Sequence, residues 1–182
     1  MQDLEIAKRR IEENNLTLSI VKDGKVIFEA VSHGISGFLE AVEKFGDRLE
    51  NASVADRVVG KAIALLCVYA KVNAVCAIIL SKTAKAVLEE NMIHNEWNEL
   101  VDNILNCNKN ELCPFEKLAT KILDPNEAFI KLKALQSSLR TSDEGEMSSE
   151  HEQFISKKDA ELKRIGEKKL KKLMESKGEQ KK

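Results

Sequence analysis

The chain has 182 residues, 29 basic and 30 acidic side chains, and a formal net charge of -1. Hydrophobic residues make up 43% of it, enough for a packed core, which excludes an intrinsically disordered body. No apolar run reaches the roughly 18–20 residues of a membrane-spanning helix, so we expect no membrane partner. Aromatic residues are only 4%, which disfavours recognition of single strands by base stacking.

Charge divides the chain into three parts. Residues 1–140 carry 18 basic and 20 acidic side chains, residues 141–155 carry five acidic and no basic ones, and residues 156–182 carry eleven basic and five acidic ones. We therefore expect a domain over 1–140, an acidic flexible linker over 141–156 and a basic helical tail over 157–182. Four cysteines and no secretory pattern at residues 1–5 predict free thiols in a cytoplasmic protein.

The first third of the domain predicts a helix, a β-hairpin and a second helix. Apolar residues recur at helical spacing near the N-terminus and alternate after residue 15, and Asp23-Gly24 is a two-residue hairpin signal. The expected elements are a helix over 3–14, strands over 16–21 and 25–30, and a helix over 35–45 that ends at Gly46.

The most apolar stretch follows. Ser53-Val54-Ala55-Asp56 matches a capping box, which predicts a buried helix from Ser53 to about Ala70. Residues 74–80 form a continuous apolar run, as in a strand covered on both faces. We expect Ser81 to cap a helix that reaches about residue 90, and a short strand within 92–105.

Two helix starts are expected near the end of the domain, at Cys113-Pro114 and Asp124-Pro125. Residues 157–177 carry a thin apolar stripe, marginal as an isolated helix. The alternation of strands and helices implies right-handed crossovers, and the hairpin makes part of the sheet antiparallel. The predicted fold class is α/β, a three-layer α/β/α sandwich with a mixed sheet and a C-terminal helical tail.

The run over residues 52–66, with A-D-x-V-V-G-K-A at 55–62, resembles the signature of a family of uncharacterised microbial proteins, a domain of unknown function. Three shorter pieces agree in order: Lys25-Val26-Ile27 with Gly34-Ile35, Ser81-Lys82-Thr83-Ala84 with Leu88, and Cys113-Pro114-Phe115-Glu116. The likeness covers about residues 3–135 and implies a cytidine-deaminase-like fold. The chain departs from the family pattern at Gly37, usually Pro, and at Asn106-Cys107, usually Asn-Arg.

That fold implies a test for zinc. Zinc deaminases place His or Cys, with Glu two residues on, at one helix start and two Cys three apart at the next. The helix starts expected here, at Ser53 and Ser81, supply neither His nor Cys. Because a catalytic zinc needs three protein ligands and a water, we expect no metal site and no deaminase reaction.

Asp56 is a candidate acid–base residue, with a helix cap as the structural alternative. In the expected helix it shares a face with Ser53 and Gly60, both candidate ligand-binding residues. A glycine inside a helix costs roughly 0.5–1 kcal/mol relative to alanine, which close backbone packing or a nearby ligand would offset. Lys61 is either a further site residue or a surface lysine.

The helix starts at Ser53 and Ser81 are expected to lie at one edge of the sheet, where their free N–H groups would bind an anion. Lys82 and Thr83 would add a charge and a hydroxyl. This predicts a small anionic or nucleotide-like ligand. The alternative is two ordinary capped helices.

Cys113 precedes an expected helix, where a thiol pKa falls, and is a candidate nucleophile. Glu116 is a candidate acid or base three residues on. The alternatives are that both residues line the site or serve structure only.

The sequence thus favours a zinc-free domain that binds a nucleotide-like or anionic metabolite, and leaves open whether it catalyses a reaction. One alternative is a non-catalytic sensor or interaction module. Another is a scaffold whose basic tail contacts nucleic acid or a partner protein. The acidic linker would mask the tail, which argues against constitutive nucleic-acid binding. The oligomeric state stays open.

Overall fold

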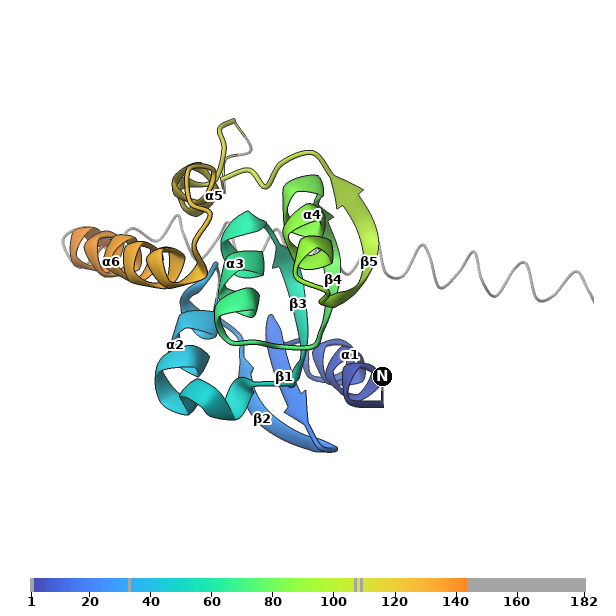
Figure 1. The fold of residues 1–182 in the computed structure, drawn as a ribbon. Helices are drawn as coiled ribbons and strands as arrows, with labels where there is room; N and C mark the ends of the chain where they lie inside the picture. Colours follow the sequence, from blue (N-terminus) through green and yellow to red (C-terminus); the bar gives the residue numbers. More distant parts are fainter. Residues whose placement is uncertain (1, 33, 107, 109, 144–182) are drawn as a thin grey trace, which may run out of the picture. The chain divides into compact units, whose positions relative to one another are not determined.

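A computed structural model describes residues 2–32, 34–106, 108 and 110–143. Its elements, in chain order, are α1 (Gln2–Asn14), β1 (Leu18–Lys22), β2 (Lys25–Ala30), α2 (Ser36–Phe45), the 3-10 helix η1 (Gly46–Leu49), β3 (Ser53–Val59), α3 (Lys61–Tyr69), β4 (Ala74–Ser81), α4 (Lys82–Glu90), β5 (His94–Val101), α5 (Pro114–Ala119) and α6 (Pro125–Asp143) (Figure 1).

The strands form one mixed sheet in the order β2-β1-β3-β4-β5. β1 pairs antiparallel with β2 and with β3, whereas β3, β4 and β5 run parallel. The helices α3 and α4 make the crossovers between the parallel strands, and Figure 1 shows them on one face of the sheet. The mixed α/β fold predicted from the sequence is confirmed.

The β-hairpin is confirmed at its predicted position. Asp23 and Gly24 both have positive φ, at 52° and 72°, which is the backbone that a tight two-residue hairpin turn requires. The Asp3 carboxylate accepts hydrogen bonds of 2.8 Å from the amides of both turn residues. The turn is therefore held from α1 as well as by its own geometry.

Helices cover both faces of the sheet. On one face, α2, α3 and α4 pack on the sheet in the larger core, whose buried residues include Phe38, Leu66 and Leu88. On the other face, α1 buries Leu4 and Ala7 against the strands in a smaller core. These are the three layers that the sequence predicts.

The helix expected from Ser53 is wrong, because Ser53–Val59 is strand β3. This strand is covered on both faces: Val54 belongs to the larger core and Ala55 to the core beneath α1. A central strand of this kind is apolar on both sides, so its pattern cannot be separated from that of a buried helix by periodicity. The helix begins only at Lys61, after Gly60.

The remaining expectations within the described residues are close to the structure. β4 and β5 lie where strands were expected, and α5 and α6 begin at Pro114 and Pro125. Asp124 accepts hydrogen bonds from the amides of Asn126 and Glu127 before α6. None of the described helices is long and apolar enough to cross a membrane. Beyond Asp143, the predicted linker and basic tail lie outside the described residues, as does Cys107.

Candidate functional site at the carboxyl edge of the sheet

Two helices begin at the carboxyl edge of the parallel strands. α3 starts one residue after Gly60 at the end of β3, and α4 starts directly after Ser81 at the end of β4. β3 and β4 are hydrogen-bonded neighbours, with Val59 beside Leu80 at this end. The carboxyl edge of parallel strands is where open α/β sheets bind ligands, so the two helix starts define the candidate site.

Glu116 of α5 occupies the start of α3. Its carboxylate accepts hydrogen bonds from the backbone amides of Lys61, at 2.8 Å, and Ala62, at 2.9 Å. Only 7% of the residue is exposed. Burial raises the pKa of Glu116, while the two amide bonds and the nearby Lys61 charge act in the opposite direction. Glu116, a candidate acid or base by sequence, is thus the cap of a helix 54 residues away.

The position of the Glu116 carboxylate explains why residue 60 is a glycine. An added Cβ atom at Gly60 would lie 2.3 Å from Oε1 of Glu116, far inside van der Waals contact. Gly60 has an ordinary φ of -99°, so its backbone conformation does not require a glycine. The neighbouring carboxylate does, because it occupies the space of a Cβ atom. Lys61 donates from Nζ to the carbonyl of Thr120 at 3.2 Å, so its side chain reaches towards the end of α5.

The start of α4 holds three of the predicted site residues. The Ser81 hydroxyl is fully buried and accepts a 3.1 Å hydrogen bond from the amide of Ala84. The Thr83 hydroxyl lies 3.0 Å from it. Lys82 and Asp102 form a 2.6 Å ion pair in which both side chains are largely exposed. This helix start therefore carries a capping hydroxyl, a second hydroxyl and an exposed cation.

Asp56 lies away from the helix starts, within β3. It pairs with Leu18 on β1 and Ala77 on β4, and its carboxylate accepts a 3.0 Å bond from the amide of Val58. Burial raises the pKa of Asp56 to about 7, against the opposing effect of the backbone bonds. The charge of Asp56 contributes to raising the pKa of the buried Cys67 thiol, although burial is the larger cause.

Ser53 lies at the opposite end of β3 from Gly60. It is in register with Ala74, the first residue of β4, and its hydroxyl is 3.3 Å from Oδ1 of Asn73. The helix face that Ser53, Asp56 and Gly60 were expected to share does not exist, because Ser53 and Asp56 lie in strand β3 and Gly60 follows that strand. The structure brings Gly60, Lys61 and Ser81 to one edge and leaves Ser53 out.

Cys113 precedes α5 as its N-cap residue and makes no side-chain cap bond. Its backbone amide donates to Ile104 at 3.0 Å. Cys113 is half-buried and Cys67 and Cys76 are buried, and none of these three cysteines is in a disulfide. Within the described part of the chain, no cluster of three His, Cys, Asp or Glu side chains could hold a metal ion.

Two features of this region have no local signal in the sequence. The pairing of Glu116 with the start of α3 joins residues that are 54 and 55 positions apart. Asp102, which directly follows β5, forms the ion pair with Lys82.

A separate groove of about 620 Å³ lies beside β2 and α2, and none of the predicted site residues line it.

A solved DUF1893 family protein from Thermotoga maritima is 29% identical, with a TM-score of 0.68, and the match covers 73% of this chain and 89% of that chain. Acinetobacter baumannii RibD gives a TM-score of 0.36 at 22% identity, over 71% of this chain and 37% of that one. A search of the curated proteins gave no match. The family model described as a domain of unknown function (DUF1893) matches residues 6–135, so the chain belongs to that family.

Proposed function

We propose that this protein binds a small anionic or nucleotide-like ligand at the carboxyl edge of β3 and β4, with the start of α4 as the anion contact. The observation that supports this most is the Glu116 carboxylate, which two backbone amides hold at the neighbouring start of α3. That carboxylate is an anion of the chain itself, bound in the way a ligand carboxylate or phosphate would be bound.

The two helix starts have different roles in this proposal. The Glu116 carboxylate already occupies the start of α3. Gly60 leaves room for this carboxylate and the Lys61 amide donates to it, so neither residue is assigned to the ligand. At the start of α4, the Ser81 hydroxyl accepts a hydrogen bond from the amide of Ala84. The first-turn amides of Lys82 and Thr83 have no acceptor within the helix. On the same turn, the Thr83 hydroxyl lies 3.0 Å from the Ser81 hydroxyl, and the exposed Lys82 ammonium group pairs with Asp102. The ligand anion would lie on this turn.

Binding without catalysis is the form of the proposal that the acidic residues favour. Asp56 and Glu116 are buried, and both carboxylates accept backbone N–H bonds that hold the fold. Neither is placed to exchange a proton with a ligand on α4. A sensor or interaction module in the cytoplasm fits these observations better than an enzyme, and the lack of a disulfide at Cys67, Cys76 and Cys113 agrees with that compartment.

A thermal-shift titration of the full chain tests the proposal. The probes are inorganic phosphate, pyrophosphate, ADP and succinate. A probe present at 100 times its dissociation constant stabilises the folded state by about 2.7 kcal/mol, a rise of several degrees in Tm. We expect Lys82→Met and Thr83→Val to abolish most of the shift caused by the best probe.

Lys71→Met is the matched control, because Lys71 is also an exposed lysine in a surface ion pair but lies before β4, at the opposite edge of the sheet. This variant should keep the full shift. No shift with any of the four probes, or an equal shift in the wild type, Lys82→Met and Thr83→Val, would contradict the proposal.

A further inference from the structure

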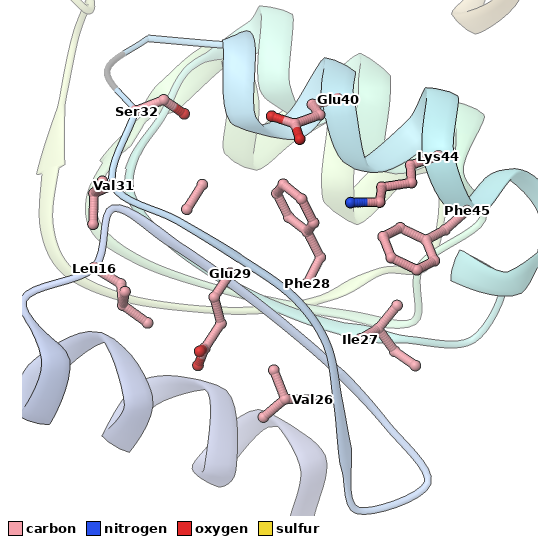
Figure 2. A pocket seen from close by; sticks show the side chains of 11 residues that line it. Leu16, Val26, Ile27, Phe28, Glu29, Val31, Ser32, Glu40, Lys44 and Phe45 are labelled. Atoms are coloured by element: carbon pink, nitrogen blue, oxygen red, sulfur yellow. The ribbon is translucent and has the colours of Figure 1, made fainter.

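The outer edge of β2 is unpaired among the described residues and is bordered by a groove. β2 is the first strand in the sheet order, so its outer side has no neighbour within the described residues. Figure 2 shows the groove of about 620 Å³ along this strand, with Phe28 and Phe45 on the side of α2. Val26 and Val31, at 43% and 66% exposure, add apolar surface along the edge. An unpaired edge of this kind is a template for another strand.

The helix α2 lies over the same edge. A Cβ atom at Gly37 of α2 would meet Ala30 at 3.0 Å and Leu18 at 3.5 Å, and these two residues face each other across β1 and β2. At the other end of α2, the Phe45 ring meets the Phe28 ring edge-on at 6.0 Å. The helix α2 therefore runs along β2 and its neighbour β1, the two strands at this edge of the sheet.

The exposed side of α2 is charged in a self-complementary way. Glu40 and Lys44 are one helical turn apart, and both line the groove (Figure 2). Among the described residues, neither forms an ion pair, while other exposed acids and lysines one turn apart do, as in Lys85 with Glu89. If two copies of α2 lie antiparallel, Glu40 of each copy faces Lys44 of the other.

We propose that two copies of this chain pair antiparallel through β2, which joins their sheets into one continuous sheet and sets the α2 helices side by side. Strands in a sheet are about 4.8 Å apart, and a helix over the outer strand pair lies about one strand spacing from a two-fold axis beside β2. The two α2 helices then lie about 10 Å apart, the ordinary separation of packed helices. Two symmetry-related Glu40–Lys44 ion pairs close the interface.

Charge reversal tests this pairing through sedimentation velocity of the full chain from low micromolar to several hundred micromolar. The wild type should be a dimer at the higher concentrations. Glu40→Lys places lysines opposite one another twice, and Lys44→Glu does the same with glutamates. Each single variant should raise the dimer dissociation constant about tenfold or more. The double variant Glu40→Lys/Lys44→Glu should dimerise like the wild type.

Mixing the two single variants is the sharpest step. The copy with two lysines and the copy with two glutamates complement each other, so they should form a heterodimer more tightly than either variant forms a homodimer. Glu89→Lys is the matched control, since it reverses one charge of an exposed turn on α4 and should leave the dimer intact. A monomeric wild type at every concentration would overturn the proposal and leave the groove to an unrelated strand. A dimer that tolerates both single reversals would overturn it as well.

Discussion

Asp56 is a buried residue whose protonation should make stability change with pH. Its pKa of about 7 lies above the ordinary value of 3.8, because burial disfavours the charged carboxylate. Between about pH 4 and pH 7 the unfolded chain loses this proton while the folded chain keeps it. The folded state therefore binds more protons, and its stability falls as pH rises through this range.

We predict that Asp56→Asn removes this loss, since the asparagine keeps an oxygen for the amide of Val58 and has no charge to bury. Relative to the wild type, the variant should gain up to about 1.36 kcal/mol in unfolding free energy for each pH unit crossed. Urea unfolding at pH 4.5 and pH 7.5 measures the change, and titrations common to both proteins cancel. A difference between the two proteins that stays constant with pH would contradict the assignment.

Gly60 and Glu116 are a pair whose coupling can be measured. Gly60→Ala forces the carboxylate off the amides of Lys61 and Ala62, and should lower the unfolding free energy by about 1–3 kcal/mol. Glu116→Ala removes the cap, with a loss of about 1 kcal/mol.

Once Glu116 is alanine, the three atoms that lie nearest to the added methyl group at Gly60 are gone. The double variant should therefore be more stable than the sum of the single losses predicts, by about 1 kcal/mol. Urea unfolding of the four proteins gives this coupling. Simple additivity would show that Gly60 is required for some other reason.

At the scale of elements, the start of α4 depends on one buried hydroxyl. Ser81→Ala leaves the amide of Ala84 without its acceptor, and we predict a loss of about 0.5–2 kcal/mol in the unfolding free energy. Thr83→Val is the comparison, because the capping bond from Ala84 stays in place and the loss should be smaller. Chemical denaturation followed by circular dichroism compares the two, and an equal loss in both would contradict the role given to Ser81.

The elements also show which parts of the fold the sequence determines locally. The hairpin was predictable, because Asp23-Gly24 is by itself a signal for a two-residue turn, although Asp3 of α1 also holds the turn. Strand β3 was not predictable in this way. Val54 packs in the larger core and Ala55 in the smaller one, so consecutive residues are apolar, as they also are in a buried helix. The sequence therefore predicts a helix start at Ser53, whereas the helix begins at Lys61, beyond the opposite end of β3.

The candidate site was predictable in part for the same reason. Ser81, Lys82 and Thr83 follow one strand and cap one helix, so their juxtaposition is local. The position of Glu116 on the start of α3 depends on how α5 packs, across more than fifty residues of chain. A carboxylate with a capping role at a distant helix has no spacing that distinguishes it from a catalytic acid.

For the whole molecule, the proposed ligand site and the proposed dimer surface lie on different parts of the sheet. The start of α4 follows β4, next to one outer strand, and the groove borders β2, the other outer strand. Ligand binding should therefore survive Lys44→Glu, and dimerisation should survive Thr83→Val. Thermal shift on the first variant and sedimentation on the second check this independence. A loss of ligand binding in Lys44→Glu would show that the two regions are coupled.

The position of the bound anion is the most direct test of the proposed function. Backbone amide signals of ¹⁵N-labelled protein can be followed while inorganic phosphate, and then pyrophosphate, is added. We predict that the amides of Lys82, Thr83 and Ala84 move most, while those of Lys61 and Ala62 stay nearly fixed because Glu116 already holds them. Changes confined to the β2–α2 groove, or none at the start of α4, would contradict an anion site at this edge.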